Sequence, residues 1–268
     1  MDVSLSYINR KIGLSLGADE VIGLLKKMQL GAELSASGRT ILLYLYLQPE
    51  VTFFTLVMTK FASLKPHTLN EFSDLLRSEV AMKGYTEVLN FMLCSWRENF
   101  DMLNHQDGKS EAVVVGNPLS SDFEIVQTRL MPGVLKAGAH NQHHPKPIKI
   151  FELGGIMLLD KKNDVGSTNR RQLAALYGDK SSGLQFIHWL VNKIMRMIGA
   201  VLLVPIGDNT GYYLKHSKEP EFLPGVQASI YYIGKRIGTF GIVHPEVLKN
   251  FGIRYACSFV ELNIESFL

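Results

Sequence analysis

The chain lacks the features that mark secreted, disulfide-stapled or membrane-spanning proteins. Its two cysteines, Cys94 and Cys257, lie far apart and form no CxxC pair. We therefore expect no disulfide framework and a reducing, cytoplasmic location. The most apolar run, from Ile41 to Met58, is interrupted by Gln-Pro-Glu at 48–50, which makes it a poor membrane span. The N-terminus has no apolar run behind a basic start, so no signal peptide is expected.

Recognisable catalytic motifs are also missing. The chain has no P-loop, no GxGxxG in the right context and no GxSxG elbow, so a hydrolase or a nucleotide-loop enzyme has no support. Gly154-Gly155 and the Gly238-x-x-Gly241 pair are expected to allow close packing or bulges. The net charge of +3 permits contact with RNA but does not indicate it.

What the chain does have is the composition of an ordinary globular protein, with 46% hydrophobic and 20% charged residues in 268. Helices are predicted at 7–12, 19–28, 68–83, 132–139 and 184–198, and after Pro245. Strands are predicted at 43–47, 51–58, 86–94, 112–115, 148–159, 172–177, 227–233, 237–243 and 258–264. Strands joined by hairpins, with helices at intervals, predict an α+β fold with a mostly antiparallel sheet.

Residues 116–154 are the most informative stretch: GNPLSSDFEIVQTRLMPGVLKAGAHNQHHPKPIKIFELG. An Asn-Pro loop is followed by RLMPG and then by a strand ending in FELG. Other runs follow the same family order, namely ASLKP, MKGYTEV, RRQLAALY, EFLPG, GTFGIVHPEVLKNFGI and FVELNIES. Together they resemble the catalytic-like module of the phenylalanyl-tRNA synthetase beta subunit. The beginning, LSYINRKIGLSLGADEVIGLLKKMQL, is similar to the accessory domain that precedes this module.

This resemblance implies a class II aminoacyl-tRNA synthetase-like antiparallel sheet flanked by helices, preceded by a partial helix-rich accessory domain. The expected domains are 1–61, a partial and disrupted accessory domain, and 62–268, the catalytic-like module. The chain is expected to be an N-terminally truncated fragment of the archaeal or eukaryotic cytosolic type. Because the family's editing region lies in the absent N-terminal domains, no editing site is assigned.

The resemblance also implies a heterotetramer of two alpha and two beta subunits, in which alpha uses ATP and Mg²⁺ to charge tRNA(Phe) with phenylalanine. The helix at 68–83 begins with a capping box, Thr68 and Glu71, and carries an apolar stripe. That stripe is the candidate partner interface: Leu69, Phe72, Leu76 and Val80. The alternative is that the helix packs on its own sheet. Contact with tRNA(Phe) is a further expectation; contact with DNA or membrane is not expected.

The chain itself is expected to be inactive. A class II site stabilises phosphoryl charge with Mg²⁺ and two arginines, one after the motif-2 strand and one in the motif-3 helix. Here the motif-2-like strand, 148–154, is followed by no arginine until Arg170. The motif-3-like end, from Glu261 to Leu268, has acids and no arginine. We therefore assign no catalytic, cofactor-binding or metal residue to this chain, and place ATP and Mg²⁺ at the level of the holoenzyme.

The segment from Ile41 to Met58 departs from the family, which carries a run like PPTRxDVxHxxDVxED whose acids hold Mg²⁺. The apolar residues here cannot bind a hard cation, so those ligands are lost. One codon choice for 43–58, read one base earlier, encodes SVSVPPTRSDVLHPCD, the family's run. We therefore hypothesise a local frameshift that ends by about Ala62, with genuine divergence as the alternative. An in-frame transcript would contradict the frameshift.

Two polar clusters have simpler interpretations. His140, His143 and His144 lack nearby cooperating ligands, which favours a polar loop over a metal site. Four lysines near the long strand could meet tRNA phosphates, but solvated strand-edge residues are the preferred interpretation: Lys146, Lys149, Lys161 and Lys162. Two alternatives to the beta-subunit hypothesis remain, namely a free-standing interaction protein with a synthetase-like fold and an independent ATP-dependent ligase.

Overall fold

The computed structural model describes residues 2–27, 31–35, 40–44, 68–106, 111–203 and 211–268. The chain forms two compact units, Met1–Pro66 and His67–Leu268. Most of the predicted strand at 43–47 and all of that at 51–58 lie outside the described residues. The same holds for the segment from Ile41 to Met58 beyond Tyr44.

The first unit is a small sheet with two helices. Strands β1, β3 and β2 pair antiparallel in that order, and α1 and α2 precede the β2–β3 hairpin: β1 Asp2–Ser4, α1 Leu5–Ile12, α2 Ala18–Lys27, β2 Gly31–Leu34, β3 Thr40–Tyr44. The hydroxyl of Ser4 caps α1 by accepting from the N–H of Tyr7, and Gly13 ends it in the left-handed region. Both predicted helices are confirmed, each starting slightly earlier than expected.

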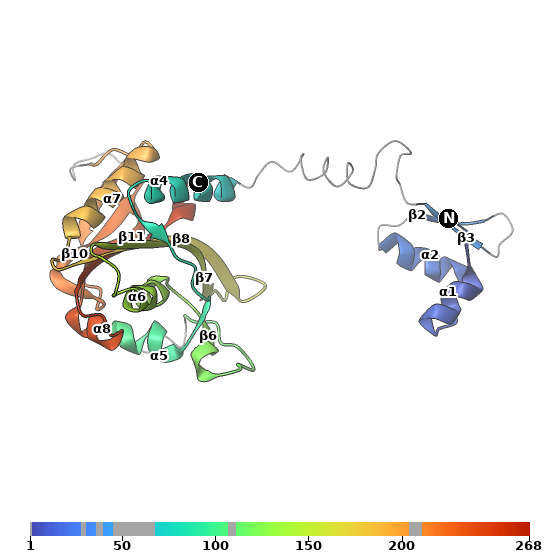
Figure 1. Ribbon diagram of the computed structural model, residues 1–268. Helices are drawn as coiled ribbons and strands as arrows, with labels where there is room; N and C mark the ends of the chain where they lie inside the picture. Colours follow the sequence, from blue (N-terminus) through green and yellow to red (C-terminus); the bar gives the residue numbers. More distant parts are fainter. Residues whose placement is uncertain (1, 28–30, 36–39, 45–67, 107–110, 204–210) are drawn as a thin grey trace. The chain divides into compact units, whose positions relative to one another are not determined.

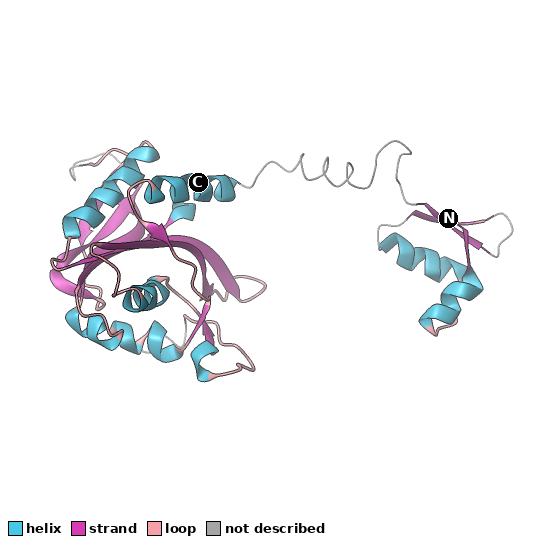
Figure 2. Cartoon of the chain, viewed as in Figure 1, coloured by secondary structure: helices cyan, strands magenta, loops and turns pink. Residues whose placement is uncertain are grey.

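The second unit is built on a seven-stranded sheet (Figures 1 and 2). Its order is β4-β7-β8-β12-β11-β10-β9, and every neighbouring pair is antiparallel except β4 with β7. The strands are β4 Thr86–Glu87, β7 Ile148–Leu159, β8 Ser167–Asp179, β9 Tyr212–His216, β10 Phe222–Tyr232, β11 Lys235–Val243 and β12 Ala256–Asn263. The sheet is therefore mixed, although mostly antiparallel as predicted.

Helices cover both faces of this sheet, with α4 and α7 on one side and α5, α6 and α8 on the other (Figure 1). Their bounds are α4 Thr68–Ala81, α5 Trp96–Asn99, α6 Met131–His140, α7 Leu184–Met197 and α8 Pro245–Asn250. Strand alternation divides the core in two. Leu173 and Ala175 of β8 pack under α4 and α7, whereas Ala174 and Leu176 pack under α6 and α8. With seven α-helices among the described residues, the fold is α+β.

Two predicted strands are wrong or shortened. The stretch at 86–94 holds only β4 and a second two-residue strand, β5 Leu93–Cys94, which pairs with β6 Ile125–Val126. Between them the chain leaves the sheet, and Asn90 instead donates from its N–H and its Nδ2 to buried Glu152. The stretch at 112–115 contributes a single bridge, Val114 to Ile125. Apolar residues there pack without forming a ladder.

Candidate ligand-binding cavity

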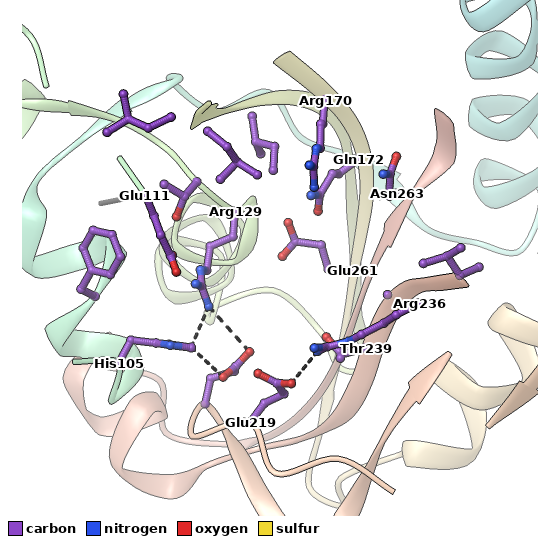
Figure 3. A pocket seen from close by; sticks show the side chains of 18 of the residues that line it. His105, Glu111, Arg129, Arg170, Gln172, Glu219, Arg236, Thr239, Glu261 and Asn263 are labelled. Atoms are coloured by element: carbon purple, nitrogen blue, oxygen red, sulfur yellow. Dashed lines mark hydrogen bonds and ion pairs between the residues drawn. The ribbon is translucent and has the colours of Figure 1, made fainter. Parts of the chain in front are cut away.

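A cavity of about 600 Å³ lies against the sheet on the side of α6 and α8. Its walls come from strands β7, β8, β11 and β12 and from the loops that follow η1 (Asp101–Leu103) and β6. Figure 3 shows its charged and polar side chains pointing toward one another: His105, Glu111, Arg129, Arg170, Gln172, Glu219, Arg236, Thr239, Glu261 and Asn263.

The register of strands β8, β12 and β11 determines which side chains form part of the cavity wall. Gln172 of β8 lies opposite Asn263 of β12, and Ala174 lies opposite Glu261, which in turn pairs with Thr239 of β11. Because side chains alternate along a strand, these polar groups share the face that looks into the cavity. Leu173 and Leu262 point the other way, into the core beneath α4 and α7.

An ion network closes one side of the cavity. Nε2 of His105 lies 2.8 Å from Oε2 of buried Glu221 and 2.7 Å from Nη1 of Arg129. Nη1 of Arg129 is 3.9 Å from the other oxygen of Glu221. Burial alone would raise the pKa of Glu221, but its contacts with His105 and Arg129 outweigh burial and lower the pKa. Glu221 therefore stays ionised and holds both partners in place.

Glu261 lies on the floor and has fewer partners. Its Oε1 accepts a hydrogen bond of 2.8 Å from the N–H of Leu130, just before α6. Burial raises the pKa of Glu261 to about 7; the Leu130 N–H and Arg129 oppose this rise, and the nearby carboxylates of Glu221 and Glu152 add to it. Its second oxygen makes no hydrogen bond to the described residues.

The three arginines of the cavity differ in how they are engaged. Arg236 pairs with Glu219, and Arg129 contacts His105 and Glu221 through Nη1. Nε of Arg129 is buried and has no hydrogen-bond partner among the described residues. Arg170, which is exposed, forms no ion pair or hydrogen bond with any described residue. The cavity therefore holds unused donors beside an unused carboxylate oxygen.

Nucleophilic chemistry has no support at this site. Burial raises the pKa of Cys94 and of Cys257 to about 12, so neither thiol is reactive at neutral pH. No group of three or more His, Cys, Asp or Glu side chains in the described part of the chain is placed to hold a metal ion. Nδ1 of His140 instead bonds the carbonyl of Lys136 within α6, at 2.8 Å. The arrangement is suited to binding a ligand.

The predicted partner interface lies on the other side of the sheet. Leu76 and Val80 are buried in the chain's own core, and Leu69 and Phe72 pack partly buried against it. These four side chains therefore attach α4 to the chain's own sheet. Leu75 on the outward face of α4 and Met82, directly after the helix, are exposed.

A second apolar surface, which the sequence patterns did not indicate, lies beyond the sheet near β5. Leu89, Phe91 and Leu119 are 87%, 80% and 97% exposed. Phe91 and Leu119 border an apolar groove of about 420 Å³, here called the Phe91 groove, which is formed by Phe91, Met92, Leu93, Val115, Asn117, Pro118, Leu119 and Phe123. Phe91 and Phe123 meet edge to face at its base. Large side chains held this far out of the core are typical of a protein-binding surface.

Comparison with known families gives the fold a context. The model of the phenylalanyl tRNA synthetase beta chain CLM domain matches residues 55–264, which include the whole sheet and its helices. The chain belongs to this family. Curated relatives include the cytoplasmic phenylalanine–tRNA ligase beta subunit of Arabidopsis thaliana, 48% identical over 292 aligned positions, and the beta subunits of Caenorhabditis elegans (35%) and Homo sapiens (32%). These alignments cover 99–100% of this chain but 48–49% of each relative, so the chain spans about half their length.

The beta chain family explains the RLMPG and FELG runs. Arg129 of the first lines the cavity, and the N–H of Leu130 donates to Glu261, which also lines it. Glu152 of the second accepts from the N–H of Asn90. The convergence of Arg129, Arg170 and Arg236 was missed, because they are distant in sequence and occur in no motif. Alternation along 172–177 and 258–264 would have placed Gln172, Glu261 and Asn263 on one face, although not around a cavity.

No helix among the described residues is both long and apolar enough to cross a bilayer.

Proposed function

We propose that this chain is the beta-subunit part of a phenylalanine–tRNA ligase, which supports charging of tRNA(Phe) carried out by an alpha subunit with ATP and Mg²⁺. The observation that carries the proposal is the beta chain family match across 55–264, together with relatives that are all named as beta subunits. A cytoplasmic location follows the printed name of the Arabidopsis relative.

The second unit is then the catalytic-like module with a class II synthetase-like sheet. A mostly antiparallel seven-stranded sheet, helices on both faces and a cavity against one face support this assignment. The domain division at about residue 62 accords with the compact unit that starts at His67.

The module is proposed to be non-catalytic. Neither position that carries a class II arginine has one here, and Glu261 stands in the cavity from the motif-3-like strand. Arg129 and Arg236 already face carboxylates, so their charge is largely used within the chain. Four glutamates line the cavity, and they would repel a triphosphate. Catalysis in the assembly is left to the alpha subunit.

Assembly with two alpha subunits and a second beta subunit would use apolar surface that the chain leaves open. The Phe91 groove and the exposed surface of Leu75 on α4 and Met82 just after it are the surfaces we propose for contact with alpha. The apolar stripe predicted on α4 contributes to this interface indirectly, because it attaches the helix to the chain's own sheet. Contact with tRNA(Phe) is proposed at the level of the assembly.

Residues 1–61 are proposed to be the remainder of the accessory domain, disrupted by a frameshift that removes the Mg²⁺ ligands. The alignment with the Arabidopsis protein runs over 292 positions, more than the 268 residues of this chain. Gaps of this kind are expected where family residues have been lost.

Co-expression of the full chain with its cognate alpha subunit, followed by size-exclusion chromatography with light scattering, tests the proposal. We expect a stable complex with aminoacylation activity. The double variant F91D/L119D should weaken association at least about tenfold, because charges would be buried in an apolar contact. V165D is the matched control, since Val165 is also 80% exposed but lies outside the groove.

Three results would speak against it. If the chain stays monomeric when co-expressed with the alpha subunit, the result would favour the hypothesis of a free-standing interaction protein. Equal loss of association in V165D would remove the Phe91 groove from the interface. Pyrophosphate exchange by the chain alone would show an independent ligase, contrary to the non-catalytic assignment.

A further inference from the structure

Arg170 and Glu261 bring two opposite charges to the cavity, and neither forms an ion pair with a described residue. Glu261 contributes a carboxylate from the floor, with one oxygen bonded to the N–H of Leu130 and the other without a hydrogen bond. Arg170 contributes a guanidinium that forms no ion pair or hydrogen bond with a described residue. Of the other charged side chains in the lining, Arg129, Arg236, Glu219 and Glu221 are engaged with one another or with His105. Glu111 adds a further carboxylate that forms no ion pair with a described residue.

The two free charges lie along one line of the sheet. Arg170 and Ala174 are four residues apart on β8, about 13 Å of strand, and Glu261 lies opposite Ala174. Between them the amides of Gln172 and Asn263 face each other across β8 and β12. Figure 3 shows the Arg170 side chain extending from its strand toward Gln172 and Glu261. A small ligand on the two amides would have an anion at one end and a cation at the other within reach.

Apolar surface completes the cavity. Phe100, Ile156, Leu158 and Ile237 line it beside the polar groups. A volume of about 600 Å³ falls within the usual range for small-molecule sites. A compact zwitterion with an apolar substituent meets all three requirements, whereas a polyphosphate would meet the four glutamates of the lining.

We propose that this cavity binds a free α-amino acid with an apolar side chain. Its ammonium group lies against Glu261 and its carboxylate against Arg170. The side-chain amides of Gln172 and Asn263, which lie between these two residues, bond the same charged groups: the oxygen of Gln172 accepts from the ammonium, and Nδ2 of Asn263 donates to the carboxylate. The buried Nε–H of Arg129 supplies a second donor for the carboxylate. This binding site lies within the chain itself and is separate from the alpha-subunit contact proposed above.

Titration calorimetry of the full chain without alpha, at pH 8, tests the site with L-leucine, L-methionine and L-phenylalanine as probes. At least one should bind. For the one that binds, the N-acetyl derivative, which lacks the ammonium charge, and the amide, which lacks the carboxylate, should each bind at least about tenfold more weakly. A charge-assisted hydrogen bond is lost in each case.

Variants assign each end of the ligand. E261Q should weaken the amino acid about tenfold without further weakening the N-acetyl derivative. R170Q should weaken binding of the amino acid about tenfold without further weakening binding of the amide. R254Q is the control, because Arg254 is an exposed arginine outside the cavity and its removal should change nothing. Thermal melts confirm that each variant is folded.

Absence of binding by all three amino acids up to about 10 mM would overturn the proposal. So would equal affinity for the amino acid and its two derivatives, which would show adventitious apolar binding. Should E261Q fail to fold, R170Q decides the question, because Arg170 is exposed and bonds no described residue; unchanged affinity in R170Q is then a negative result. Association with alpha is measured separately, so failure here leaves the proposed function standing.

Discussion

Two glutamates flank Ala174 on the same face of the sheet, Glu152 from β7 and Glu261 from β12. Burial raises the pKa of both carboxyl groups, and hydrogen bonds to their charged forms oppose this rise to different extents. Glu152 accepts from the backbone N–H and from the Nδ2 of Asn90, at 3.2 and 2.7 Å, whereas Glu261 has one backbone donor. The charged form of Glu261 is therefore less well compensated than that of Glu152, as is common for carboxylates at functional sites.

The raised pKa of Glu261 predicts a pH-dependent stability. The folded pKa of Glu261, about 7, lies above its ordinary value of 4.5, so the stabilisation is complete below pH 4.5 and is lost as pH rises through 7. Between pH 5 and pH 8 the wild-type chain should lose about 2 to 3 kcal/mol of unfolding free energy through this group. In E261Q the side-chain oxygen still accepts from the N–H of Leu130. Between pH 5 and pH 8 this variant should lose about 2 to 3 kcal/mol less unfolding free energy than the wild-type chain. Urea unfolding of both proteins at the two pH values measures the difference; parallel profiles would contradict it.

Elements with a clear apolar pattern were predicted well. The bounds of β7 match the predicted 148–159, and α7 ends one residue before the predicted 198. β8 runs longer than its predicted 172–177, because polar Ser167 to Arg171 continue the pairing with β7. The stretch at 86–94 failed because its β-prone residues serve an exposed surface and the Asn90–Glu152 contact, and neither leaves a periodic signature.

Packing between elements gives a second prediction. A Cβ on Gly178 of β8 would overlap the ring of Tyr255, whose hydroxyl donates to the carbonyl of Gly138 in α6 at 3.0 Å. G178A should therefore destabilise the protein by about 1 to 3 kcal/mol, because the ring must move and its hydrogen bond is disturbed. G116A, where a Cβ meets nothing within 4 Å, should stay within about 0.5 kcal/mol of wild type. Denaturant melts compare the two; similar values would mean that Tyr255 moves freely.

At the scale of the whole molecule, the chain has separate cores. The two large clusters and the smaller one around Phe100 consist of residues from the second unit. Among the residues of the first unit whose burial is described, Val21 is the buried apolar one, with Leu5, Ile8, Leu16, Ile22 and Leu25 packed partly buried around it. So small a core supplies little stability. The second unit carries both the cavity and the Phe91 groove.

A protein made of residues 67–268 should therefore fold without the first unit. Its core is complete, and we expect its melting temperature to lie within about 3 °C of that of the full chain, a difference below about 1 kcal/mol. Circular dichroism melts of the two proteins provide the comparison. A larger drop, or loss of the cooperative transition, would show that the first unit contributes to the stability of the sheet.

The sequence by itself determined the elements and the family. Periodicity, caps and turn residues act within a few positions, so they are readable along the chain, as the helix at 184–198 and the strand at 148–159 show. The ordered runs from ASLKP to FVELNIES carried the resemblance because they keep residue types at places where the fold constrains them.

Only the tertiary structure decided where charges meet. His105, Arg129 and Glu221 come from three distant segments, and the pairing of β8 with β12 brings Gln172 opposite Asn263 in a register that no local signal specifies. It also decided that the apolar stripe of α4 is used by the chain's own core, while Phe91 and Leu119 stay outside. The physical reason is that burial and electrostatic fields depend on distance in space, and a sequence records only distance along the chain.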